Sequence, residues 1–274
     1  MKVRAWAKTD VGKQRTINED CHFLDMDLGL LLVFDGMGGH RAGEIASNLA
    51  METMASFYHK YVNSIENHLE IFDNFDDNFS FKANLLRQAV YAANRIVLQK
   101  SYENESMVGM GSTVAGLAID GLNVAMVNVG DSRLYLVRKG YMEQISRDHT
   151  LAEDQVERGL MSREEARESH LRHILSSVIG VDSRIRVHMD ELVAFPGDIF
   201  FLCTDGLTAV VSDEEILQDL TNGPLGPETL DRLIEKANER GGPDNMTLAL
   251  AVFSDDPPEE VSEPRKAVGP GVHG

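Results

Sequence analysis

Residues 30–40 read LLLVFDGMGGH: five apolar residues, then Asp35, then a glycine-rich turn. An apolar run of this length is typical of a buried strand, and the Asp-Gly that follows it places a carboxylate at the edge of a sheet. The arrangement occurs a second time, where the apolar run 199–202 is followed by CTDG at 203–206. The sequence therefore predicts two strands that each deliver a carboxylate to a sheet edge.

Two further acidic motifs lie near the ends of the chain. Glu19 and Asp20 close RTINED at 15–20, and Asp244 stands in GGPDN at 241–245. Taken singly, each motif has an ordinary interpretation, because Asp-Gly after a strand and Gly-Gly-x-Asp-Asn before one usually form turns. Their combination favours a site, since carboxylates repel one another unless a cation compensates, and a hard metal ion is the usual reason to gather them.

Composition limits the class of protein and its partners. The chain has 274 residues, enough for one large domain, and a formal net charge of −18 that argues against nucleic-acid or anionic-membrane partners. No stretch approaches the roughly 20 apolar residues that span a bilayer, and residues 1–10 lack a secretion signal, so we expect a cytoplasmic protein. Cys21 and Cys203 are too few for a disulfide framework and are expected to pack as small hydrophobes.

Strand and helix patterns occur in groups along the chain. Strands are expected at 3–8, 22–26, 30–34, 112–119, 123–129, 133–138, 187–193, 198–203 and 246–253, and long helices at 42–58, 81–101 and 227–240. Strands in runs with helices between the runs favour antiparallel sheets flanked by helices, an α+β fold, over alternating βαβ units. The domain is expected to span 1–253, with an insertion loop at 63–78 and a disordered acidic Pro- and Gly-rich tail at 254–274.

The ordered motifs resemble those of the bacterial type 2C (PPM-type) metal-dependent protein serine/threonine phosphatases. The matching pieces are 12–20, 33–44, 111–113, 128–135, 148–149, 202–207 and 241–247. The resemblance implies a four-layer α-β-β-α sandwich, in which two central antiparallel sheets are flanked by helix pairs. It also implies a helical flap subdomain at 148–185 beside the active site.

The resemblance implies a role for each acidic motif. Asp35 matches the carboxylate that bridges two metal ions. The carbonyl of Gly36 matches a ligand of one ion, and Asp205 and Asp244 match ligands of the other. Glu19 and Asp20 match carboxylates that act through metal-bound waters. The implied cofactors are two Mn²⁺ or Mg²⁺ ions, which all-oxygen sites prefer.

Five other positions matter for the reaction or for a third ion. Arg15 matches the guanidinium that binds the substrate phosphate, and Asp131 matches a ligand of a third metal ion. Ala209 stands where the family usually has a further Asp of that third site, so we expect the third ion to bind weakly. Met37 stands where some relatives carry a histidine proposed as general acid, and nearby His40 is a candidate acid or a helix-capping residue.

The function implied by the resemblance is hydrolysis of phosphoserine and phosphothreonine by a water that two metal ions activate, with no covalent enzyme intermediate. Its partners would be phosphorylated proteins, including a Ser/Thr kinase and its targets, and the enzyme would be a monomer. Two alternatives stay open: a regulatory pseudophosphatase that binds a partner without catalysis, and a phosphoesterase that acts on a small molecule.

Overall fold

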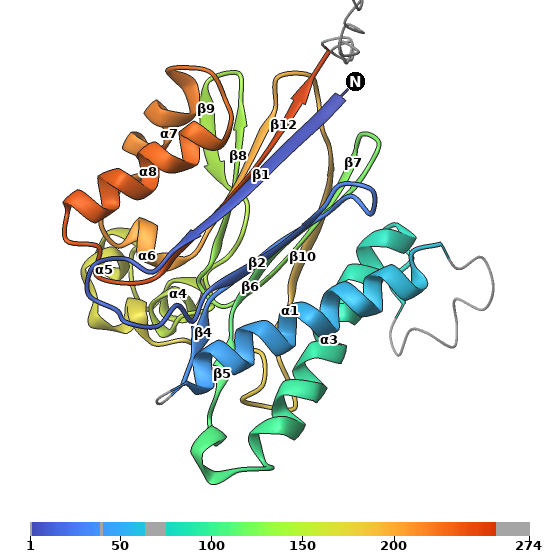
Figure 1. The fold of residues 1–274 in the computed structure, drawn as a ribbon, viewed down its shortest axis with the longest axis vertical. Helices are drawn as coiled ribbons and strands as arrows, with labels where there is room; N and C mark the ends of the chain where they lie inside the picture. Colours follow the sequence, from blue (N-terminus) through green and yellow to red (C-terminus); the bar gives the residue numbers. More distant parts are fainter. Residues whose placement is uncertain (1, 39–40, 64–74, 256–274) are drawn as a thin grey trace, which may run out of the picture.

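Two five-stranded antiparallel sheets form the centre of the molecule (Figure 1). The computed structural model describes residues 2–38, 41–63 and 75–255. The first sheet contains, in spatial order, β1 (Lys2–Asp10), β12 (Met246–Ser254), β11 (Ile199–Cys203), β8 (Arg133–Arg138) and β9 (Tyr141–Gln144). The second contains β10 (His188–Val193), β7 (Asn123–Val129), β6 (Val114–Asp120), β3 (Leu30–Phe34) and β2 (Cys21–Asp25). A short ladder joins β4 (Gly36–Met37) to β5 (Gly111–Ser112).

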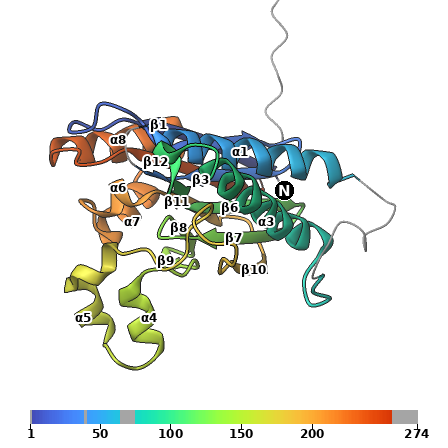
Figure 2. The same ribbon diagram turned by 90° about the horizontal axis from the view of Figure 1, so that it is seen from below.

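Helices cover the outer face of each sheet. Helices α1 (Ala42–Tyr61) and α3 (Phe81–Ser101) pack on the second sheet, and α6 (Asp205–Thr208), α7 (Asp213–Thr221) and α8 (Pro227–Glu239) pack on the first. Figures 1 and 2 show these helix layers on opposite sides of the strands. The predicted α+β sandwich of two antiparallel sheets with flanking helices is therefore confirmed.

Strand β3 shows why its sequence is apolar throughout. Leu30, Leu32 and Phe34 face the core under α1 and α3, whereas Leu31 and Val33 face the core between the two sheets. Alternate side chains of a strand point to opposite faces, so a strand in the middle of four layers is buried on both. All five residues of β3 are fully buried, and β11 divides its side chains between two cores in the same way.

The structure differs from the predicted strands at two places. The strand expected at 112–119 is interrupted at Thr113, which separates β5 from β6, and the Thr113 side chain is used in the site described below. Strand β9 was not predicted, because its four residues, YMEQ, contain no continuous apolar run and none of them is buried. Lys139 and Gly140, with φ of 54° and 82°, form the tight turn that returns the chain from β8 to β9.

Short helices occupy the segment 148–185 for which a flap is predicted. They are α4 (Leu151–Glu157), α5 (Arg163–Glu168) and the 3-10 helix η2 (His170–His173); a further 3-10 turn, η1 (Glu105–Met107), follows α3. Figure 2 shows α4 and α5 projecting away from the layered body. Most of the predicted insertion loop and nearly all of the predicted tail lie outside the described residues. None of the helices described is both long enough and apolar enough to cross a membrane.

Candidate metal centre

The register of the second sheet places two of the acidic motifs together. Phe34, the last residue of β3, pairs with Cys21, the first residue of β2. Asp35 therefore leaves β3 beside the point where Asp20 enters β2, because neighbouring antiparallel strands run in opposite directions.

The register of the first sheet gathers the other motifs at the same end. Cys203, the last residue of β11, pairs with the first residue of β8 on one side and with β12 near its start on the other. Asp205 follows β11, whereas Asp131 precedes β8 and Asp244 precedes β12. Five carboxylate motifs from separate parts of the chain thus meet at one end of the sandwich.

A cavity of about 250 Å³ lies where these motifs meet. Its lining consists of Arg15, Glu19, Asp35, Gly36, Met37, Gly38, Thr113, Asp131, His173, Leu175, Asp205, Asp244 and Asn245. All but one of the residues predicted for the site line this cavity. The exception is Asp20, which is 5 % exposed and is not among the lining residues.

Burial and mutual repulsion act together on these carboxyl groups. Burial, followed by the charges of Asp20 and Asp205, raises the pKa of Asp35 well above its usual value. Burial, followed by the charge of Asp205, raises the pKa of Asp131 to about 8. Carboxyl groups in this situation ionise readily only when positive charge is brought to them.

Hydroxyl groups hold two of the carboxylate loops in place. Thr113 Oγ1 accepts a hydrogen bond of 3.0 Å from the backbone N–H of Asp35 and lies 2.6 Å from the Ser132 hydroxyl. Ser132 follows Asp131, so this pair of hydroxyls ties the turn after β3 to the turn before β8. Thr113 and Ser132 are both buried.

A threonine also fixes the buried Asp20. The Thr204 hydroxyl donates to Asp20 Oδ2 at 2.8 Å, and Thr204 Oγ1 accepts from the backbone N–H of Thr247 at 2.9 Å. Burial, opposed by the Thr204 hydrogen bond, raises the pKa of Asp20 to about 8. Asp20 is therefore attached to the loop that carries Asp205.

Glu19 lies against the start of α1. The position that a side chain on Gly43 would fill is 2.5 Å from Glu19 Oε1, so the glycine leaves room for the carboxylate. Asn245 Oδ1 accepts from the backbone N–H of Glu19 at 2.8 Å, which joins this loop to the one that carries Asp244. Burial raises the pKa of Glu19.

Among the residues that the structure describes, Arg15 is the only Arg or Lys in the cavity lining. Its Nη2 donates to Asp244 Oδ2 at 2.8 Å, and about half of its side chain is exposed. The guanidinium group therefore lies at the mouth of the cavity, next to a buried group of carboxylates.

The arrangement of strands, loops and carboxylates can be compared with known proteins. Residues 13–251 match the family described as Protein phosphatase 2C. The chain belongs to this family.

Named relatives of this type 2C chain are bacterial. It is 35% identical over 250 residues to the serine/threonine protein phosphatase PstP of Mycobacterium tuberculosis, covering 91% of the chain but 45% of that relative. It is 31% identical to the serine/threonine phosphatase stp of Listeria monocytogenes, covering 90% of the chain and 95% of that relative. The chain thus spans less than half the length of the mycobacterial protein.

Solved structures show the same fold. The crystal structure of the PstP catalytic domain in complex with two manganese ions matches with a TM-score of 0.76 and 33% sequence identity, covering 92% of the chain and 99% of that domain. The crystal structure of M. tuberculosis PstP/Ppp gives a TM-score of 0.79 at 32% identity, with the same coverage.

The donor groups of this type 2C site fit a hard divalent cation. Besides the imidazole of His173, the cavity offers carboxylate and carbonyl oxygens, and buried Cys203 does not line it. Oxygen donors of this kind suit Mg²⁺ or Mn²⁺. Glu19 Oε1 is buried without a hydrogen-bond partner among the described residues. Among the described residues, no group of three or more His, Cys, Asp or Glu side chains is arranged closely enough to hold a metal ion.

Sequence reasoning predicted the carboxylates that line the cavity but missed part of what surrounds them. His173 and Leu175 line the cavity from the segment 148–185, for which the resemblance implies a place beside the active site, but no spacing in the sequence singles out either residue. The supporting roles of Thr113 and Thr204 were also not predicted, although both residues lie within or beside the quoted motifs. His40, the candidate acid, lies outside the described residues.

Proposed function

We propose that the chain is a metal-dependent phosphatase that hydrolyses phosphoserine and phosphothreonine in proteins. The observation that carries the proposal is the convergence of Asp35, Asp205 and Asp244 on one cavity with Arg15 at its mouth. The relatives' names, which describe serine/threonine phosphatases, support the substrate class. A cytoplasmic location remains a prediction from the sequence.

The residues that would hold two Mn²⁺ or Mg²⁺ ions are those with oxygen donors in the cavity, together with the buried Asp20, which does not line it. We assign them as Asp35, the Gly36 carbonyl, Asp205 and Asp244 in direct contact, Glu19 and Asp20 through water, and Asp131 for a weaker third ion. When bound, such ions supply positive charge and a Lewis acid that makes water a better nucleophile near neutral pH.

The chain's own groups bind and orient the phosphate. Arg15 offers a planar fork of N–H donors that matches two phosphoryl oxygens. A water oxygen then attacks phosphorus, and the bond to the serine or threonine oxygen breaks as that oxygen takes up a proton. No covalent intermediate is needed, and neither cysteine is suited to form one, because burial raises the pKa of both thiols.

The experiment that tests this proposal is hydrolysis of a phosphothreonine peptide with and without Mn²⁺. We expect Mn²⁺-dependent phosphate release that Asp35→Ala and Asp205→Ala each reduce by at least about a thousandfold. Asp27→Ala changes an exposed carboxylate in the turn after β2 and should retain wild-type activity.

Two outcomes would contradict the proposal. Wild-type protein that binds Mn²⁺ in calorimetry but leaves every phosphopeptide intact would favour a pseudophosphatase. Faster hydrolysis of small phosphate esters than of every peptide would favour the phosphoesterase alternative.

A further inference from the structure

Two neighbouring residues with no part in the proposed function lie beside the turn that carries Asp131. They are Asp148 and His149, one of the pieces that resemble the type 2C family. The Asp148 side chain is 16 % exposed, and His149 is buried. Burial of polar groups costs free energy unless they are bonded, so the partners of these two residues indicate what they do.

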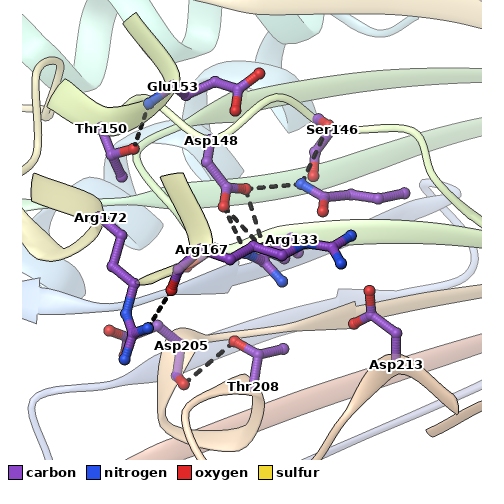
Figure 3. Close-up of polar contacts among 12 residues, drawn as sticks. Arg133, Ser146, Asp148, Thr150, Glu153, Arg167, Arg172, Asp205, Thr208 and Asp213 are labelled. Carbon is purple, nitrogen blue, oxygen red and sulfur yellow. Dashed lines mark hydrogen bonds and ion pairs between the residues drawn. The ribbon is translucent and has the colours of Figure 1, made fainter. Parts of the chain in front are cut away.

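Asp148 is bonded to the first residue of β8, Arg133. The guanidinium group donates to Asp148 Oδ2 from Nη2 at 2.7 Å and from Nε at 3.0 Å, and Gln144 Nε2 donates to Asp148 Oδ1 at 2.7 Å. Figure 3 shows the bonds between Arg133 and Asp148 in the same close-up as the loop that carries Asp205. Two charge-assisted bonds from one guanidinium fix the direction of a carboxylate as well as its distance. Asp148 is therefore fixed relative to the start of β8.

His149 is bonded to the backbone of Gly130. The N–H of His149 donates to the Gly130 carbonyl at 2.8 Å, and the N–H of Gly130 donates to His149 Nδ1 at 3.2 Å. Burial, followed by the charge of Arg186, lowers the pKa of His149 to about 4, so the ring is neutral near pH 7 and its Nδ1 can accept a hydrogen bond. A single residue thus holds both backbone polar groups of Gly130.

Together these bonds enclose the turn between Gly130 and Arg133. Gly130, with φ of 94°, comes directly before Asp131, and Arg133 comes two residues after it. The consecutive residues Asp148 and His149 therefore hold this turn at both of its ends. The backbone of Asp131 has little freedom to move.

Asp131 needs this support because the cavity around it is acidic. Asp205 lines the same cavity, and after burial its charge is the largest influence that opposes ionisation of Asp131. Position 209 supplies no further carboxylate, because it is an alanine. In a loosely held turn, repulsion from Asp205 would move an ionised Asp131 toward solvent. A turn bonded at both ends keeps the carboxylate at the cavity.

We propose that Arg133, acting through Asp148, and His149 are positioning residues that hold the Asp131 carboxylate at the candidate metal centre. They need not touch an ion or a substrate, because they act on the turn between them. The inference rests on the proposed function for the role of Asp131 as a ligand of a weaker, third divalent cation. It adds the groups on which the affinity for that cation depends.

Mn²⁺ binding to the whole chain, measured by calorimetry, tests this role without using hydrolysis. Asp131→Asn should weaken the weakest Mn²⁺-binding step, and Arg133→Met should weaken the same step by at least about tenfold, the usual effect of removing a group that orients a metal ligand. In the Asp131→Asn background, Arg133→Met should change the affinity by less than about twofold, because a residue that acts through Asp131 then has nothing left to position. Arg133→Lys should keep part of the affinity, since lysine retains the charge but loses the planar fork.

The other end of β8 offers a matched control. Arg138 donates to Asp198 Oδ2 from Nη2 at 2.7 Å and to Asp198 Oδ1 from Nε at 2.9 Å, a similar pair that does not line the cavity. Arg138→Met should lower the thermal unfolding midpoint, as Arg133→Met does, but leave every Mn²⁺-binding step unchanged. A purely structural role for Arg133 would make the two variants behave alike.

A second variant covers the case in which Arg133→Met does not fold. The double change Arg133→Met with Asp148→Leu replaces the ion pair by apolar groups and leaves no unpaired carboxylate. It should recover stability but not Mn²⁺ affinity.

The outcomes separate this inference from the proposed function. Wild-type Mn²⁺ affinity in the folded Arg133 variants would overturn the positioning role alone. So would Mn²⁺ binding that Asp131→Asn leaves unchanged, or an effect of Arg133→Met that is equally large without the Asp131 carboxylate. Absence of Mn²⁺-dependent hydrolysis of every phosphopeptide would instead overturn the proposed function, while the calorimetry would still decide whether Arg133 positions Asp131.

Discussion

At the scale of single residues, buried carboxylates are useful only where neutral groups hold them in place. Asp20 and the turn after Asp35 are each fixed by a threonine hydroxyl, Thr204 and Thr113 respectively. A hydroxyl can both donate and accept, so it can join two loops without adding charge to a crowded acidic site. These threonines therefore position the carboxylates and need not touch a substrate.

Replacement of Thr113 by valine tests this role. The change keeps the shape of the side chain but leaves the Asp35 N–H and the Ser132 hydroxyl without their partner. We expect the free energy of unfolding to fall by about 1–3 kcal/mol and Mn²⁺ affinity in calorimetry to weaken. Thr221→Val removes a hydroxyl that donates only to its own helix, at the Leu217 carbonyl, and should change neither quantity appreciably. Unchanged Mn²⁺ affinity in Thr113→Val would show that the hydroxyl bridge does not position Asp35.

At the scale of elements, the site depends on how closely loops at the strand ends approach one another. A side chain at Gly206, in α6, would lie 1.9 Å from the carbonyl oxygen of Asn245, just before β12. Asp205 is the first residue of α6, so this close approach sets the separation between Asp205 and Asp244. Glycine is required there by proximity of the two backbones rather than by an unusual φ.

The substitution Gly206→Ala should therefore separate the two loops. We expect a loss of stability of about 1–3 kcal/mol from overpacking, together with loss of most Mn²⁺-dependent activity. Near-ultraviolet and far-ultraviolet circular dichroism would show that the sheets remain. Gly121→Asn is the control, because Gly121 has φ of 61° with nothing within 4 Å of its missing side chain, a conformation that asparagine tolerates. Wild-type activity in Gly206→Ala would contradict the close-approach argument.

The elements also show how far the sequence could predict this structure. Strands buried on both faces, such as β3 and β11, were predicted because their apolar runs are continuous. Strand β9 lies at an edge and is largely polar, so its sequence carries no such pattern. The same holds for the site: acidic motifs are visible in the sequence, whereas the approach of His173 depends on how a separate segment folds back.

At the scale of the whole molecule, the fold concentrates acidic groups in one place within an already acidic chain. Burial, together with the charge of the neighbouring Asp205, opposes ionisation of these groups, as the raised pKa values of Asp20 and Asp131 show. Divalent cations would relieve this opposition, and binding to the folded state alone stabilises that state. Stability, ionisation and metal binding should therefore depend on one another.

This dependence predicts that pH has opposite effects on the stability of the folded protein with and without bound metal. Asp20 and Asp131 have pKa values of about 8 in the folded protein, against about 3.9 in an unfolded chain. Folding therefore favours their protonated forms, and the stability this contributes is complete below about pH 4 and is lost as pH rises through about 8. Burial lowers the pKa of three histidines, the buried His149 and the half-buried His22 and His188. They act in the opposite direction, but only below about pH 6.5.

The window from pH 6.5 to 8 isolates the carboxylates. In EDTA, we expect the thermal unfolding midpoint to fall by about 5 °C or more across this window. With excess Mn²⁺ it should stay level or rise, because fewer protons compete for the site at higher pH. Asp131→Asn, which removes one of the perturbed carboxylates, should flatten the decline in EDTA, whereas the exposed Asp27→Asn should leave it unchanged. A midpoint in EDTA that rises from pH 6.5 to 8 would mean that these carboxyl groups do not share a buried site. There would then be no repulsion between buried carboxylates for a metal ion to relieve.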